Sequence, residues 1–172
     1  MSAIRPPTSE LAIIALGSNL GDSRQLFSNA IARLRRFSAN PLLISSLWRT
    51  APVDCPPGSP MFLNAVVGLL PRPDETPESL LPKLQKLEKE FGRRPKMVLN
   101  EARPLDLDLI AFAGQTRNTP QLVLPHPRAH QRRFVLQPLS EIAPDLVLPG
   151  QTRTVAELLR ELPPDEAMKK IE

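Results

Sequence analysis

The sequence predicts an α+β fold in which helices pack on an antiparallel sheet, and three observations support this prediction. The chain has 172 residues, 41% of them hydrophobic and 23% charged, which is the size and composition of a single soluble domain. Its 21 prolines favour short elements joined by rigid loops over a helical bundle, because proline fixes φ and lacks an N–H donor. Short apolar runs also alternate with stretches of helical periodicity, a pattern typical of mixed structure.

The first third of the chain predicts a strand, a helix and a second strand. Residues 11–16 are a continuous apolar run of the length of a buried strand. A helix follows, with Asp22 as its N-cap residue and apolar side chains on one face. Residues 42–49 suit a second strand, and four prolines in residues 50–60 then predict a long loop.

A third strand and a second helix are predicted next. Residues 62–70 form another apolar run of strand length. Thr76 and Pro77 suit the N-cap and first position of a helix, and leucines at helical spacing extend it to Gly92. Residues 93–104 lack periodicity and predict a second long loop, a kind of segment that often carries function.

The rest of the chain predicts a fourth main strand and mostly helical segments. Residues 105–112 form this strand, and residues 122–124 suit a short fifth one. Residues 132–142 predict a helical region bent at Pro138, and residues 155–162 predict a last amphipathic helix. The main order, strand-helix-strand-strand-helix-strand, is that of a ferredoxin-like sandwich with helices on one face of the sheet.

The whole of 1–172 is expected to be a single domain. Residues 1–10 and 163–172 are expected to be flexible tails. The first ten residues lack the apolar segment of a signal peptide, and no run of about 18 apolar residues occurs. We therefore expect a cytoplasmic protein without a membrane span.

Two aspartates alternate with leucines at the start of the fourth strand. Because side chains alternate across a strand, Asp106 and Asp108 leave one face about 7 Å apart along the chain, and the leucines are buried on the other. Paired carboxylates on a rigid strand are ligands that Mg²⁺ takes. An ordinary half-exposed strand whose aspartates meet surface arginines has the same pattern. The pentapeptide alone leaves both interpretations open.

Basic residues lie in the loop that leads into this strand. Arg93 and Arg103 lie near its two ends, with Arg94 and Lys96 also in the loop. A carboxylate pair beside guanidinium groups suits a metal-bound polyphosphate, because arginine stabilises charge that shifts during transfer. The net charge of +4 permits an anionic ligand. The sequence contains neither GxxxxGK[ST] nor GxGxxG, so a P-loop or dinucleotide-binding fold is not supported.

Six segments, taken in order, resemble the 6-hydroxymethyl-7,8-dihydropterin pyrophosphokinase family of folate biosynthesis. They are ALGSNLGD (15–22), WRTAPV (48–53), PMFLNAVV (60–67), LEKEFGRR (87–94), ARPLDLDLIAFAG (102–114) and PHPRAHQRRFVLQPLSEIAPDLVLP (125–149). The resemblance implies a ferredoxin-like sandwich. It also implies an enzyme that transfers pyrophosphate from MgATP to the hydroxymethyl group of the pterin and releases AMP.

The resemblance also implies roles for individual residues. It implies that Asp106 and Asp108 hold two Mg²⁺ ions that bridge the triphosphate, and that Arg93 and Arg103 are the catalytic arginines. The pterin-binding residues that it implies are Thr50, Ala51, Val53, Phe62, Asn64 and Phe134. The nucleotide-binding residues that it implies are Glu88, Arg93, Arg103, Leu109, His126 and Arg132. For Glu88, a glutamate on the helix surface is the alternative.

The loop over residues 92–104 lacks a tryptophan that is frequent in the resembling family. We still expect it to be a mobile lid that closes over nucleotide and pterin, relying on Arg93 and Arg103.

Two other functions compete with this hypothesis. A ferredoxin-like nucleic-acid-binding module fits the positive charge, but the two strand aspartates would repel phosphate unless a cation intervened. A catalytically inactive regulatory domain fits badly with the presence of both aspartates and both loop arginines. The expected partners are therefore ATP and the pterin, with no nucleic acid, no membrane and no obligate protein partner.

Overall fold

The fold is built around one main sheet. The structure is a computed structural model that describes residues 5–52, 55–92 and 102–171. In this part of the chain the main sheet contains β1 (Ala12–Ser18), β2 (Leu43–Ile44), β3 (Leu47–Thr50), β4 (Phe62–Leu69), β5 (Asp106–Phe112) and β8 (Lys169–Ile171). The helices are α1 (Ser23–Leu34), α2 (Pro77–Glu90), α3 (Arg133–Ile142) and α4 (Val155–Glu161), with short 3-10 helices at Thr8–Glu10, Arg35–Phe37 and Ala129–Gln131. Two short strands, β6 (Arg117–Asn118) and β7 (Val123–Leu124), pair with each other outside this sheet.

The strand order is that of a ferredoxin-like sandwich, as the sequence predicts. The strands lie in the order β5-β1-β4-β3-β8, the neighbouring pairs are antiparallel, and β2 also pairs with β4. Because β1 lies between β4 and β5, Gly17 is the register partner of Asn64 on one side and of Asp106 on the other. This register brings two distant segments to neighbouring positions at one end of the sheet.

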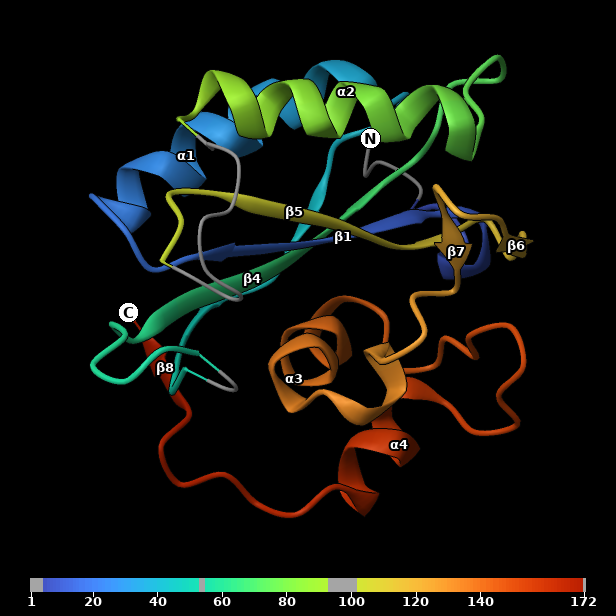
Figure 1. The fold of residues 1–172 in the computed structure, drawn as a ribbon. Coiled ribbons are helices and arrows are strands. Elements are labelled where there is room, and N and C mark those ends of the chain that lie inside the picture. Colours follow the sequence, from blue (N-terminus) through green and yellow to red (C-terminus); the bar gives the residue numbers. More distant parts are fainter. Residues whose placement is uncertain (1–4, 53–54, 93–101, 172) are drawn as a thin grey trace.

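Helices cover both faces of the sheet, which corrects the prediction that they lie on one face only (Figure 1). The helices α1 and α2 pack on one face, whereas α3 packs on the other face and α4 packs against α3. The physical reason lies in the central strands. The adjacent residues Ile13 and Ile14 are both fully buried, so β1 is apolar on both faces and each face needs a covering layer.

The first two long helices begin where the sequence predicts. The Asp22 side chain accepts a hydrogen bond from the Gln25 N–H at 3.2 Å, at the start of α1. Thr76 and Ser79 form a reciprocal capping box ahead of α2, with Pro77 in its first position. These side chains satisfy N–H groups that have no partner within the helix, and they fix where each helix begins.

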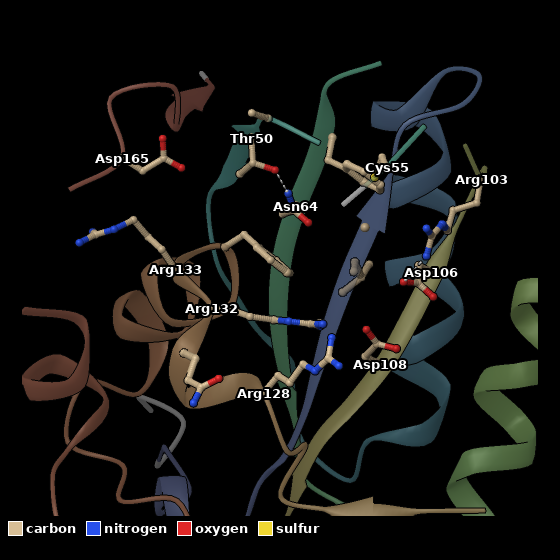
Figure 2. A pocket seen from close by; sticks show the side chains of 17 residues that line it. Thr50, Cys55, Asn64, Arg103, Asp106, Asp108, Arg128, Arg132, Arg133 and Asp165 are labelled. Carbon is tan, nitrogen blue, oxygen red and sulfur yellow. Dashed lines mark hydrogen bonds and ion pairs between the residues drawn. The ribbon is translucent and has the colours of Figure 1, made fainter. Parts of the chain in front are cut away.

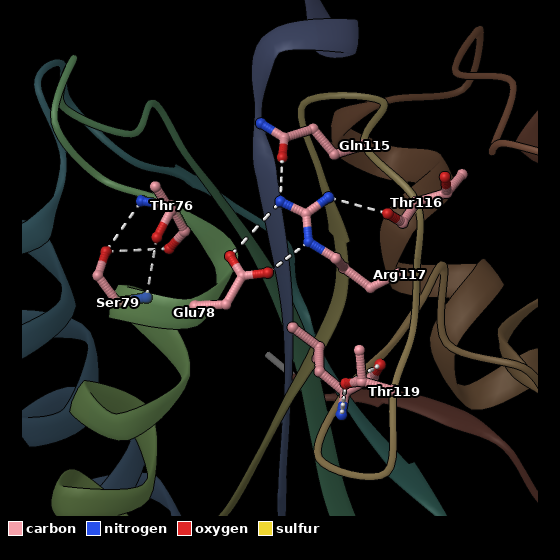
Figure 3. A network of polar contacts seen from close by, with 8 residues as sticks. Thr76, Glu78, Ser79, Gln115, Thr116, Arg117 and Thr119 are labelled. Carbon is pink, nitrogen blue, oxygen red and sulfur yellow. Dashed lines mark hydrogen bonds and ion pairs between the residues drawn. The ribbon is translucent and has the colours of Figure 1, made fainter.

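A polar network joins α2 to the hairpin of β6 and β7 (Figure 3). Arg117 on β6 donates to Glu78 in the first turn of α2, and its Nη2 donates to Gln115 Oε1 at 2.8 Å. The hydrogen bond from Arg117 lowers the pKa of Glu78. Exposed ion pairs of this kind contribute little stability, so the network mainly aligns the hairpin with the helix.

The predicted second strand over residues 42–49 is divided into β2 and β3. Between them, Ser45 donates its N–H to the Val66 carbonyl at 3.0 Å, and its Oγ accepts the Val66 N–H at 2.9 Å. A side-chain oxygen therefore takes the place of a ladder carbonyl, which interrupts the regular pairing with β4.

The terminal segments contact the fold, in contrast to the flexible tails expected over residues 1–10 and 163–172. The strand β8 pairs with β3, and Met168 just before it is buried. Without β8, the backbone groups of β3 would form an open sheet edge, which explains the pairing. Near the other end, the Arg5 guanidinium donates to the Ile142 carbonyl.

No helix in the described ranges is long and apolar enough to cross a membrane.

Candidate active site

A cavity of about 460 Å³ lies on the α3 side of the sheet, beside β1, β4 and β5 (Figure 2). Residues of β1 form its floor, and residues of β5 line one side. Residues at the end of β3 and the start of β4 line a second side, and residues between 128 and 134, at the start of α3, line a third. Segments that are far apart in the sequence thus meet at one cavity.

The two aspartates of β5 both face this cavity. Asp106 and Asp108 are half-buried and line it, whereas Leu107 and Leu109 are buried in the core under α1 and α2. The alternation of the strand therefore places both carboxylates on one face, as the sequence predicts. The carboxylates offer negatively charged oxygen ligands on a rigid strand.

Arg103 is held beside these carboxylates. Its Nη1 lies 3.4 Å from Asp106 Oδ2, and its Cζ lies 5.7 Å from the ring centre of Phe62. Its backbone is bonded to Asn19 in both directions, because the Arg103 N–H donates to Asn19 Oδ1 at 2.9 Å and the Asn19 N–H donates to the Arg103 carbonyl at 3.1 Å. The buried Asn19 thus fixes where the arginine enters the cavity.

Another part of the cavity has aromatic and amide groups. Phe62 on β4 and Phe134 on α3 line it, together with Ala51. Asn64 is buried, and its Nδ2 donates to Thr50 Oγ1 at 2.5 Å. This bond fixes the orientation of the amide and leaves Oδ1 as an acceptor. Apolar rings with one oriented amide suit a planar heterocycle that carries N–H donors.

Arginines at the start of α3 give the cavity a positively charged side. Arg128 and Arg132 line it and extend toward the side where Asp108 lies (Figure 2). The Cζ of Arg132 lies 5.3 Å from the ring centre of Phe134, within the range of a cation–π contact. The cavity therefore combines carboxylates with guanidinium groups, as a metal-bound polyphosphate requires.

His126 lies next to this positive group but is not among the residues that line the cavity. Its Nδ1 accepts the Arg128 N–H at 3.2 Å, and its own backbone N–H donates to the Ile110 carbonyl at 2.8 Å. Partial burial lowers the pKa of His126, and the charges of Arg132 and Arg128 lower it further, against the opposing effect of Asp106. The lowered pKa favours the neutral ring, and in that form the acceptor role of Nδ1 assigns the proton to Nε2.

Glu88 on α2 is buried, which excludes the alternative of a glutamate on the helix surface. Its Oε2 accepts the Leu107 N–H at 2.9 Å. Glu88 is not among the residues that line the cavity. The hydrogen bond from Leu107 thus links Glu88 to β5, the strand that carries the two aspartates.

Comparison with known proteins identifies the family. Residues 13–144 match the family described as 7,8-dihydro-6-hydroxymethylpterin-pyrophosphokinase (HPPK). The chain belongs to the HPPK family. A 2-amino-4-hydroxy-6-hydroxymethyldihydropteridine pyrophosphokinase from Porphyromonas gingivalis is 37% identical over 137 residues, which are 78% of this chain and 91% of that protein. The Bacillus subtilis protein of the same name is 38% identical over 135 residues, which are 78% of each.

Longer relatives contain an HPPK region as one part. The Folic acid synthesis protein fol1 of Pneumocystis carinii is 36% identical over 148 residues, or 86% of this chain. This chain spans only 20% of that protein. A wild-type HPPK-DHPS structure from Plasmodium falciparum superimposes with a TM-score of 0.68 at 13% identity, over 93% of this chain and 48% of that one. At this identity the likeness concerns the fold.

The cavity brings together most of the HPPK site residues that the sequence predicts. They are Thr50, Ala51, Phe62, Asn64, Arg103, Asp106, Asp108, Arg132 and Phe134. Arg93 and Val53 lie outside the described residues, as does most of the predicted lid over 92–104. The Leu109 side chain packs in the core, so only its backbone can contact a ligand.

Several residues that line the HPPK cavity were missed by sequence reasoning. Arg128 and Gln131 line it, and their place in the motif over 125–149 was a usable signal. Asp165 also lines it, although nothing near it in the sequence indicates a site. Arg133 donates to carbonyl groups at the end of α4, so it helps to hold the segment that carries Asp165.

The carboxylate pair fits an Mg²⁺ ion that is bound together with phosphate. Within the described ranges, no group of three or more His, Cys, Asp or Glu side chains is placed to hold a metal. Mg²⁺ does not need such a group, because proteins commonly bind it through one or two carboxylates together with substrate phosphates and water. Asp106 and Asp108 line the cavity and are a carboxylate pair of this kind.

Proposed function

We propose that this protein transfers a pyrophosphoryl group from ATP to the hydroxymethyl oxygen of 6-hydroxymethyl-7,8-dihydropterin and releases AMP, as a cytoplasmic step of folate synthesis. Its membership of the HPPK family supports this reaction. One structural observation carries the proposal: the two aspartates and the aromatic pair of Phe62 and Phe134 line the same cavity. Sites that share one cavity allow direct transfer between two bound substrates.

In this proposal, Asp106 and Asp108 would hold two Mg²⁺ ions that bind together with the triphosphate. Bound Mg²⁺ neutralises phosphate charge and orients the triphosphate for in-line displacement. Asp106 is fixed before any ligand arrives, because its strand is paired to β1 at Gly17 and its carboxylate is close to Arg103. The aspartates therefore need little rearrangement when the nucleotide binds.

Arginine side chains stabilise the charge that moves during transfer. The hydroxymethyl oxygen forms a bond to the β-phosphorus and loses its proton, while the bond from that phosphorus to the α,β-bridging oxygen breaks and AMP leaves. Arg103 and Arg132, together with Arg93, contact the phosphates and stabilise the negative charge that develops on the leaving oxygen.

The pterin lies between Phe62 and Phe134, and Asn64 recognises its edge. The rings supply contact area, and the amide supplies identity. Because Asn64 Nδ2 already donates to Thr50, its Oδ1 accepts from an N–H group of the pterin. The backbones of Ala51 and Val53 complete these hydrogen bonds.

The nucleotide side of the site includes His126 and the backbone of Leu109, together with Arg132. Because Nδ1 of His126 already accepts a backbone N–H, only Nε2 can donate to a nucleotide oxygen. A neutral donor at this position can bind an anionic ligand without adding another positive charge beside the arginines.

The test is to mix the protein with MgATP and 6-hydroxymethyl-7,8-dihydropterin and to separate the nucleotide products. We expect AMP and pterin diphosphate in equal amounts. An Asp106→Asn protein purified in the same way controls for contaminating kinases. ADP as the product, or no turnover by the unaltered protein, would contradict the proposal.

A further inference from the structure

The strand that carries both aspartates lies at an edge of the main sheet. In the described residues, β5 pairs with β1 on one side and with no strand of this sheet on the other. Backbone groups on the open side of an edge strand lack a ladder partner. The two acidic residues are therefore on a strand that only one neighbouring strand of the described sheet supports.

A buried carboxylate supplies one of the missing partners at this edge. The Leu107 N–H donates to Glu88 Oε2 at 2.9 Å, and Leu107 is the residue between Asp106 and Asp108. This N–H belongs to the peptide unit that joins Asp106 to Leu107. Holding its plane therefore restrains the strand between the two aspartates, whose side chains lie on one face.

The carboxylate itself is held on a rigid support. Glu88 is 9% exposed, and its neighbours on the inner face of α2, Leu80, Leu84 and Leu87, are at most 1% exposed. Acidic side chains are rarely buried to this extent without a partner. The buried face of α2 thus fixes an acceptor oxygen against the middle of the aspartate pair.

We propose that Glu88 is a positioning residue for the metal site. It acts through the Leu107 peptide, which keeps Asp106 and Asp108 directed at one metal-bound triphosphate, and it does not itself contact the nucleotide. This inference rests on the proposed function and replaces the direct nucleotide-binding role that the family resemblance implies for Glu88.

The test compares two substitutions at the same position. Glu88→Gln keeps an acceptor oxygen for the Leu107 N–H, and Glu88→Ala removes it. The matched control is Glu90→Ala on the same helix, because Glu90 is exposed and is paired with Arg33 at 2.7 Å. The measurements are Mn²⁺ binding in the presence of a non-hydrolysable ATP analogue, pterin binding by calorimetry, and kcat and KM for AMP formation.

We expect Glu88→Ala to weaken Mn²⁺ binding by roughly 10- to 100-fold, which is typical when a group that orients a metal ligand is removed. Pterin affinity should stay near that of the unaltered protein. Glu88→Gln should recover most of the metal affinity, and Glu90→Ala should change neither ligand. If Glu88→Gln loses as much metal affinity as Glu88→Ala, the negative charge rather than the acceptor matters and the proposal is wrong.

Two further readouts distinguish a positioning role of Glu88 from a general structural role. Amide hydrogen exchange at Leu107 should be slow in the unaltered protein and in Glu88→Gln, and fast exchange in the unaltered protein would overturn the proposal even if Glu88→Ala does not fold. Equal loss of metal and pterin binding in Glu88→Ala would indicate a general structural role and would also overturn it. Since Mn²⁺ and nucleotide binding need no turnover, weaker binding in Glu88→Ala supports the inference even if no AMP is formed.

Discussion

One added methyl group at Gly17 should slow the reaction strongly without disturbing the fold. A Cβ built at Gly17 would lie 3.4 Å from Asn64 Oδ1, 3.9 Å from Asp106 Cβ and 4.0 Å from Phe62 Cδ1. These are ordinary contact distances, so the strand can accommodate alanine. All four residues line the cavity, so the methyl group would occupy space between the proposed pterin and metal sites.

The size of the effect follows from displacement of the substrates. A misplacement of about 1 Å can lower a rate by roughly 10²-fold, which corresponds to about 2.7 kcal/mol. We expect Gly17→Ala to lower kcat/KM for AMP formation by about this factor. Its melting temperature should be unchanged or higher. Replacing glycine by alanine lowers the conformational entropy of the unfolded chain, which stabilises the folded protein by about 0.4 to 1 kcal/mol.

Gly68→Ala is the matched control for this prediction. A Cβ at Gly68 on β4 would lie 3.1 Å from Leu11 Cδ1 and 3.6 Å from Ile142 Cδ1, so it would crowd the core rather than the cavity. Overpacking of this kind costs about 1 to 3 kcal/mol, and we expect a lower melting temperature with little change in kcat/KM. The reasoning is refuted if Gly17→Ala retains the kcat/KM of the unaltered protein, or if the two substitutions lower activity equally.

Three further predictions test other parts of the site. Asp106→Asn and Asp108→Asn should each lower turnover by at least ~10²-fold, about 3 kcal/mol, because each removes a charged metal ligand. The thermal unfolding of each variant should change little. Near-normal turnover at saturating Mg²⁺ would exclude the metal role of that residue. Phe134→Ala should weaken pterin binding by roughly 1 to 3 kcal/mol and leave ATP affinity unchanged in calorimetric titrations, whereas equal loss of both would indicate a core role. The lowered pKa of His126 means that the unfolded imidazole takes up a proton at a higher pH than the folded one. His126 therefore contributes to the free energy of unfolding above pH 6.5, the ordinary pKa of histidine. This contribution is lost as the pH falls through the lower pKa of His126 in the folded protein. The melting temperature should fall less on acidification in His126→Gln than in the unaltered protein, and equal falls would contradict this assignment.

Local patterns predicted the parts of the fold that depend on neighbouring residues in the chain. The period-two alternation around Asp106 gave the correct face for both carboxylates, because strand geometry alone decides it. Asp22 and Thr76 likewise marked the starts of α1 and α2, because N-caps act within one helical turn.

Features that depend on distant partners were not predictable in this way. The strand β8 pairs with the edge that β3 offers, and nothing in the sequence near Lys169 indicates that edge. The burial of Glu88 depends on how α2 packs against β5, which its helical spacing does not reveal. The family motifs, and not a local pattern, predicted that Phe62 and Phe134 belong to one site. Their elements are far apart in the sequence, so no local pattern relates them.

If the proposed function is right, the position of Gly17 between Asn64 and Asp106 also limits which alcohols can serve as substrates. Neighbouring strands lie about 4.8 Å apart, so the backbones at Asn64 and Asp106 are separated by about 10 Å across β1. The hydrogen bonds of the sheet hold this separation, whatever the surrounding loops do. A ring recognised at Asn64 and a triphosphate held at Asp106 are thus kept at one span, which a side arm of one length bridges. A pterin with its hydroxyl on a two-carbon arm should still bind through its ring, but its oxygen would miss the β-phosphorus, so the sheet itself selects the length of the alcohol.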